Sequence, residues 1–63
     1  MPRFEDDDGR SMDVHYDAHN DMTVWETYDP ELDIAGGGQL GGDQVGDIIR
    51  DFEGKGYHPV GSD

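Results

Sequence analysis

The chain has 63 residues, no cysteine, and a net charge of −12 that comes from 16 acidic and 4 basic side chains. This length allows one small domain of marginal stability, and the absence of cysteine excludes disulfides and thiolate zinc sites. The charge disfavours direct binding to nucleic acid or to an anionic membrane, because both need Lys and Arg to neutralise phosphate. With no long apolar run and no signal-peptide pattern, we expect a cytoplasmic protein.

The N-terminal residues carry an acidic block that runs from Glu5 to Asp8 and is followed by Gly9. Like charges in a block repel each other and stay solvated. We therefore expect a mobile acidic arm over residues 1–11 and a single small domain over residues 12–63.

Residues 12–28 predict a β-hairpin. Residues 12–18 alternate between apolar and polar types, which is typical of a half-buried strand. Residues 22–28 are rich in β-branched and aromatic types and predict the returning strand. The turn chemistry of the intervening residues leaves the register open. A three-residue loop would place Trp25 on the acidic face of the hairpin, whereas a two-residue loop would place it beside the apolar residues.

After the break at Asp29-Pro30, Leu32 and Ile34 suggest a short third strand. The glycines at 36–38 and 41–42 then predict a flexible connector rather than a phosphate-binding loop, since no Lys-Ser or Lys-Thr follows them.

The clearest element spans residues 43–53, where apolar residues recur at the spacing of one helix face: Val45, Ile48, Ile49 and Phe52. Asp43 is the expected N-cap and Gly54 the expected residue beyond the C-terminus of this helix. Residues 57–60 predict a short closing strand, which Pro59 confines to a sheet edge or a strand end. The order predicts an α+β fold, in which a small antiparallel sheet packs one face against one amphipathic helix.

Little in the sequence points to catalysis. A metal site could draw on the alternating residues Asp13, His15, Asp17, His19 and Asp21 with His58 as a third imidazole, but their spacing follows no known motif. The acidic block before Gly9 fails the EF-hand register. No nucleophile lies in a segment rigid enough to orient a base. We therefore expect no enzyme activity, no cofactor and no metal.

The rows of carboxylates are the remaining candidate for a function. Asp43, Asp47 and Asp51 recur every four residues and predict an acidic stripe along the helix. The hairpin adds further acids and an aromatic residue that could anchor a partner: Asp13, Asp17, Asp21, Glu26 and Trp25. Tyr28 and Tyr57 are additional candidate anchors, because aromatic residues dominate interface hot spots. Regular rows of anions imitate a phosphate backbone, so the expected partner is a basic, nucleic-acid-binding protein surface.

In size, charge and layout, the whole chain resembles the small acidic phage-encoded inhibitors of the DNA-mimic and anti-CRISPR class. The resemblance implies a protein that occupies the nucleic-acid-binding surface of a host complex in the host cytoplasm. It rests on no shared motif, so it assigns a role to no residue.

An alternative explanation of the acidity is adaptation to a high-salt cytoplasm. Aspartate outnumbers glutamate and Lys55 is the only lysine, which suits a small halophilic accessory or binding module. In that case the charge says nothing about a partner. The mutual repulsion of such chains favours a monomer, although an exposed edge at residues 57–60 could still pair with a second copy.

Overall fold

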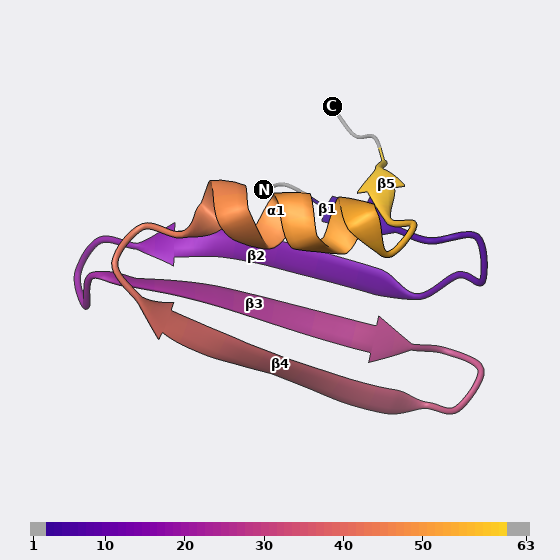
Figure 1. Cartoon of the computed structure of the whole chain (residues 1–63). Coiled ribbons are helices and arrows are strands. Elements are labelled where there is room, and N and C mark those ends of the chain that lie inside the picture. Colours follow the sequence, from indigo (N-terminus) through magenta and orange to yellow (C-terminus); the bar gives the residue numbers. More distant parts are fainter. Residues whose placement is uncertain (1–2, 61–63) are drawn as a thin grey trace.

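The computed structural model describes residues 3–60 and confirms the predicted α+β fold. A five-stranded antiparallel sheet, ordered β4-β3-β2-β1-β5, packs against one helix (Figure 1). The elements are β1 (Arg3–Glu5), β2 (Ser11–Asp17), β3 (Met22–Asp29), β4 (Ile34–Gly41), α1 (Val45–Gly54) and β5 (His58–Pro59). Residues 1–2 of the predicted arm and residues 61–63 of the predicted domain lie outside the described residues.

The β2–β3 hairpin has a longer loop than either length that the sequence analysis weighed. Asp17 lies opposite Met22, so residues 18–21 form the loop, and Asp21 adopts a positive φ of 53° within it. Val14 lies opposite Trp25 in this register. Trp25 is therefore on the apolar face of the hairpin, where the two-residue alternative had placed it.

The glycine-rich segment is a strand, so the prediction of a flexible connector is wrong. β4 pairs with β3 along its whole length, from Ile34 opposite Asp29 to Gly41 opposite Met22. Close approach to Trp25 explains the glycines. A Cβ at Gly38 would lie 2.6 Å from the indole ring, and a Cβ at Gly37 would lie 2.4 Å from the Trp25 carbonyl oxygen. A side chain at Gly38 would prevent the indole of Trp25 from lying across β4, and one at Gly37 would collide with the backbone of β3.

The helix forms where its apolar periodicity predicts, but its ends differ from the expectation. Its N-cap is Gln44 rather than Asp43, whose Oδ1 instead accepts a hydrogen bond from the Val45 N–H at 3.3 Å. At the other end Gly54 belongs to the helix. The residue with positive φ is Gly56 at 100°, and the Tyr57 N–H just beyond it bonds back to the Phe52 carbonyl oxygen at 3.1 Å.

Residues 3–11 are not the mobile arm that the acidic block predicts. Phe4 is buried, and β1 lies between β2 and β5, with Phe4 opposite both Met12 and Pro59. Burial of the Phe4 ring acts against the repulsion within the block, because fully burying such a side chain stabilises by about 1.5–3 kcal/mol. β5 lies at the sheet edge, as Pro59 predicts.

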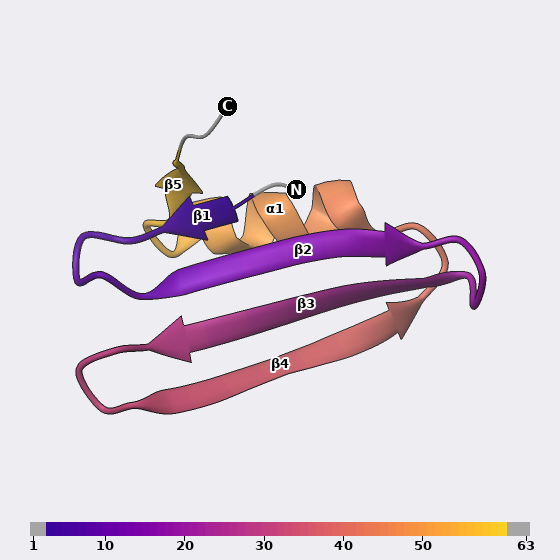
Figure 2. The ribbon, with the colours of Figure 1, turned by 180° about the vertical axis from the view of Figure 1, so that it is seen from behind.

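The core lies between the helix and one half of the sheet. Its buried residues are Phe4, Met12, Val14, Ile48 and Phe52. In both views α1 lies over β1 and β2 and leaves β4 uncovered (Figures 1 and 2). Among residues 3–60, no helix has the length and apolar character needed to cross a bilayer.

Candidate acidic binding surface

The open face of the sheet, which faces away from the helix, carries three of the predicted partner-binding acids. Side chains alternate between the faces of a strand, so Met12 and Val14 turn toward the helix and their neighbours turn away from it. Asp13 and Asp17 on β2 and Glu26 on β3 therefore share the open face. The register also places Asp13 directly opposite Glu26.

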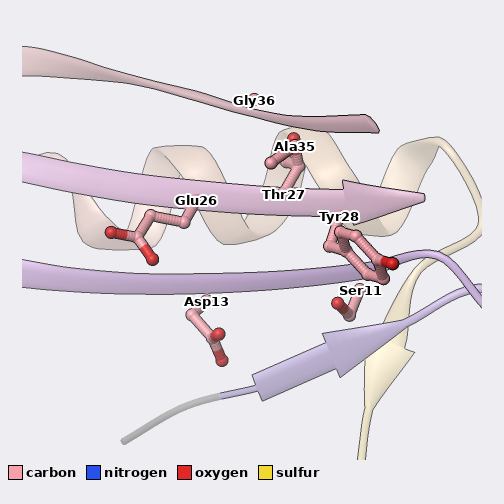
Figure 3. A pocket seen from close by; sticks show the side chains of 7 residues that line it. All are labelled: Ser11, Asp13, Glu26, Thr27, Tyr28, Ala35 and Gly36. Carbon is pink, nitrogen blue, oxygen red and sulfur yellow. The ribbon is translucent and has the colours of Figure 1, made fainter. Parts of the chain in front are cut away.

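A shallow hollow of about 390 Å³ lies beside this acidic pair (Figure 3). It is lined by Ser11, Asp13, Glu26, Thr27, Tyr28, Ala35 and Gly36. The Tyr28 hydroxyl donates a hydrogen bond to Asp33 Oδ1 at 2.8 Å. This bond raises the pKa of Tyr28 above its ordinary value, and partial desolvation and the charge of Asp29 add to the shift. A carboxylate from each of two strands and a tyrosine ring thus border one space.

In the described part of the chain, the two carboxylates of the hollow, Asp13 and Glu26, form no ion pair with Lys or Arg. Arg3, which lies opposite Asp13, instead has its Nε 3.7 Å from Glu5. Like charges directly opposite each other on a sheet are destabilising. An arriving guanidinium or ammonium group would relieve this repulsion, because carboxylates and an aromatic face are the groups that bind such cations.

Two acids stabilise the β2–β3 loop: Asp17 at the end of β2 and Asp21 within the loop. Asp17 accepts hydrogen bonds from the Asn20 side chain at 2.8 Å and from the His19 N–H at 3.0 Å. The Asn20 side-chain bond lowers the pKa of Asp17 and, with the backbone bonds, outweighs the effect of desolvation. Asp21 accepts a hydrogen bond from the Tyr16 hydroxyl, which raises the pKa of that tyrosine.

The helical acids lie on the other layer of the molecule. Asp47 pairs with Arg50 at 3.6 Å and Asp51 pairs with Lys55 at 3.5 Å, and all four side chains are exposed. Asp43 precedes the helix. The predicted acidic residues therefore do not form one array: the sheet carries one group and the helix carries another, with the core between them.

The candidate aromatic anchors are also divided. Trp25 is half-buried beside the core on the helix side of the sheet, and Tyr57 packs its ring edge-on against Phe52, with the centroids 5.1 Å apart. Tyr28 is 42% exposed and belongs to the open face. Of these three residues, Tyr28 is thus the one beside the unpaired acids.

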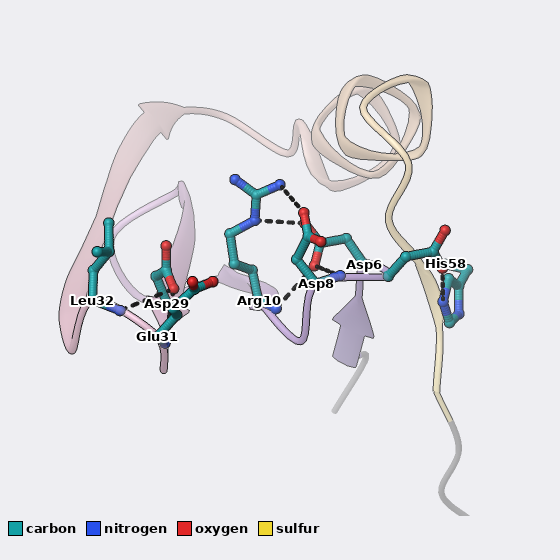
Figure 4. A network of polar contacts seen from close by, with 8 residues as sticks. Asp6, Asp8, Arg10, Asp29, Glu31, Leu32 and His58 are labelled. Atoms are coloured by element: carbon teal, nitrogen blue, oxygen red, sulfur yellow. Dashed lines mark hydrogen bonds and ion pairs between the residues drawn. The ribbon is translucent and has the colours of Figure 1, made fainter.

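A second acidic region joins part of the acidic block Glu5 to Asp8, whose carboxylates the sequence adds to the anionic rows, with acids that the sequence did not mark as candidates. The β1–β2 turn and the β3–β4 turn meet at one end of the sheet, where a Cβ at Gly9 would lie 3.9 Å from Pro30 (Figure 4). The acids in these turns or at the strand end beside them are Asp6, Asp7, Asp8, Asp29, Glu31 and Asp33. The predicted hairpin could have revealed this region, because antiparallel pairing brings the start of β2 beside the end of β3.

Asp6 and Asp29 shape this end of the sheet. Asp6 accepts hydrogen bonds from the backbone N–H groups of Asp8 and Arg10 and from Arg10 Nε at 2.6 Å. Although burial acts to raise the pKa of Asp6, these bonds and the Arg10 charge lower it below its ordinary value. Asp29 accepts the N–H of Glu31 at 3.0 Å. These carboxylates fix the turns. The neighbouring Asp7 and Asp8 are exposed, and Asp8 also accepts a hydrogen bond from Arg10 at 3.3 Å.

No family model, curated protein or solved structure matches this chain. The candidate site therefore rests on its own geometry. Within residues 3–60, no three His, Asp or Glu side chains gather in a way that could hold a metal ion, and Asp13, His15 and Asp17 lie spread along β2.

Proposed function

We propose that this protein is a non-enzymatic acidic inhibitor that binds a basic, nucleic-acid-binding surface of a partner protein and blocks it. The observation that carries the proposal is the hollow on the open face, where the unpaired carboxylates of Asp13 and Glu26 border the same space as Tyr28. An arginine or lysine of the partner would enter this hollow. The partner surface would be one that otherwise holds phosphate.

The energetics of the open face support this proposal. Placing Asp13 opposite Glu26 carries a repulsion cost across the strands in the free protein, which the charge of Arg3, opposite Asp13 on β1, acts against. A cation from the partner removes that cost on binding. The net charge of −12 also attracts a basic partner over a distance and speeds the encounter at low salt.

The partner's chemistry sets where and how the protein would act. The protein would meet a nucleic-acid-binding partner in the cytoplasm. If the protein is phage-encoded, this is the cytoplasm of the host cell. Repulsion between two copies favours a monomer that binds its partner one to one.

High-salt adaptation is the second candidate, and the distribution of acids favours it in one respect. Acidic side chains also cover the outer side of the helix and both ends of the sheet, away from the hollow. A thermal melt in about 0.1 M and about 2 M KCl separates the two hypotheses, since added salt screens the repulsion. An inhibitor is well folded at the lower concentration, whereas a halophilic module gains most of its structure at the higher one.

Affinity capture tests the proposed function. The protein is immobilised and exposed to a bacterial lysate at low salt, and the captured proteins are eluted with duplex DNA. We expect DNA to release a nucleic-acid-binding protein, whose DNA binding in a separate assay is inhibited by the free acidic protein. The double variant Asp13→Asn, Glu26→Gln should capture little of it, and the equally charged Asp47→Asn, Asp51→Asn should capture it normally. A captured protein that binds DNA and the acidic protein simultaneously would contradict the proposal.

A further inference from the structure

The outer edge of β4 stands out from the other strands of the sheet. β4 is eight residues long, and no charged residue or proline lies within Ile34–Gly41. β1, β2 and β3 each carry charged side chains, and the opposite edge, β5, is two residues long and contains Pro59. Among residues 3–60, no strand pairs with the outer edge of β4. Long edge strands normally carry charges, prolines or bulges that prevent pairing with other chains.

The register shows which backbone groups this edge presents. The Gly42 N–H donates to the Asp21 carbonyl oxygen at 2.8 Å, continuing the ladder in which Gly41 lies opposite Met22. Hydrogen-bonded and non-hydrogen-bonded pairs alternate along an antiparallel ladder. The residues whose N–H and C=O groups point outward are therefore Ala35, Gly37, Gln39 and Gly41.

The side chains along the edge leave room for an added strand. On the helix side, Ile34 and Leu40 are 58% and 44% exposed, which offers apolar contacts near the two ends of β4. On the open face, Gly37 lies opposite Glu26 and has no side chain. Neighbouring strands are about 4.8 Å apart, so an arginine on an added strand crosses Gly37 and reaches Glu26 and the hollow.

The charges around β4 indicate the kind of chain that pairs with it. The uncharged strand is flanked by Asp33 before it and by Asp43 after it. If a second copy paired with β4 over its length in an antiparallel orientation, Asp33 of each copy would lie near Asp43 of the other. These flanking acids repel a second copy and attract an extended segment with basic residues near its ends.

We propose that the outer edge of β4 binds an extended basic segment of the partner protein by β-strand addition, with an arginine of that segment lying over Gly37 and entering the hollow. This inference rests on the proposed function and deepens it, because it names the backbone edge that receives the partner. Main-chain hydrogen bonds give such complexes affinity, and alternate side chains give them specificity.

A synthetic peptide tests the inference on the full chain. The probe is Lys-Val-Thr-Val-Arg-Val-Thr-Val-Lys, titrated while the protein amide signals are followed by NMR. We expect slowed hydrogen exchange at Ala35, Gly37, Gln39 and Gly41. Gln39→Pro, which removes an outward N–H, should weaken binding at least tenfold, whereas Gln39→Ala should change it less than twofold. Circular dichroism checks that both variants fold.

The peptide offers a control that does not depend on the folding of a variant. N-methylation of one alternate set of peptide amides should abolish binding, and methylation of the other set should not, because only one peptide edge faces β4. Equal effects of the two sets, or no binding at millimolar peptide, would overturn the edge inference. Shifts confined to Asp13, Glu26 and Tyr28 would also overturn it but leave the proposed function standing. A dimer with protected β4 amides in the absence of peptide would identify a second copy of the protein as the occupant of this edge. That result would overturn the proposal that the edge binds a basic segment.

Discussion

The two halves of the sheet differ in what covers them. β1 and β2 lie under the helix and contribute Phe4, Met12 and Val14 to the core. β4 lies beyond the helix, and nearly all of its residues are exposed (Figure 2). The covered half therefore contributes the buried core, while the uncovered β4 presents a free backbone edge and the exposed apolar side chains of Ile34 and Leu40. In so short a chain, one thin core supports a surface that adds little to folding.

The largest expected effect comes from opening the core of the covered half. Phe52→Ala removes a buried ring that packs between the helix and the sheet and should cost about 3–5 kcal/mol. A domain of this size has a total stability of about 3–9 kcal/mol, so we expect a greatly lowered melting temperature or no cooperative transition. The matched change in the uncovered half, Leu40→Ala, should cost less than about 1 kcal/mol because Leu40 is exposed. Similar losses in both variants would show that the two halves do not differ as described.

A smaller effect is expected where β4 approaches Trp25. Gly38→Ala places a methyl group 2.6 Å from the indole ring and should destabilise the protein by about 1–3 kcal/mol, with a change in tryptophan fluorescence. Gly41→Ala is the control, since nothing lies within 4 Å of an added Cβ there. The control should be neutral or slightly stabilising, because alanine restricts the unfolded chain. A neutral Gly38→Ala would mean that Trp25 does not lie across the strand.

A pH-dependent effect is expected at the end of the covered half. The hydrogen bonds and the Arg10 charge hold the pKa of Asp6 below its ordinary value of 3.8. A group with a lowered folded-state pKa contributes stability above its unfolded pKa and loses that contribution as the pH falls through the folded pKa. The melting temperature of Asp6→Asn should therefore lie below that of the original protein near neutral pH, and the difference should shrink below about pH 3.8. A difference that stays constant with pH would exclude an electrostatic role for Asp6.

The smallest expected effect on stability has the opposite sign. Glu26→Gln removes the repulsion from Asp13 and should stabilise the protein by about 0.2–1 kcal/mol in denaturant titrations at low salt. The gain should shrink as salt is added. Glu53→Gln, on the exposed side of the helix, is the comparison. A destabilised Glu26→Gln variant would show that Glu26 supports the fold, contrary to a role reserved for binding.

The sequence allowed the helix and the two hairpin strands to be predicted because their side chains repeat with a clear period. Val45, Ile48, Ile49 and Phe52 mark one helix face, and alternation marks β2. Glycine has no side chain and therefore contributes to no apolar period. For this reason the run from Gly36 to Gly38 did not predict the strand β4. β1 was missed because Phe4 is a single apolar residue in a charged segment, and its burial depends on partners distant in the sequence.

The candidate site was only partly predictable for a related reason. Asp13, Asp17 and Glu26 were identified as acids of the hairpin, but whether Asp13 meets Glu26 depends on the length of the β2–β3 loop. The position of Trp25 depends on the same register. The split between sheet acids and helix acids follows from the packing of Ile48 and Phe52, which sends Asp47 and Asp51 to the opposite side of the molecule.

The most direct test of a binding surface on the open face compares two variants of equal net charge by calorimetric titration with the arginine-containing peptide. Asp13→Asn, Glu26→Gln neutralises the hollow on the open face, and Asp47→Asn, Asp51→Asn neutralises the same number of charges on the helix. We expect the first variant to bind about tenfold more weakly, a loss of about 1.4 kcal/mol, and the second to bind within about twofold of the original protein. Equal losses in the two variants would mean that only net charge matters, and would contradict a binding surface on the open face.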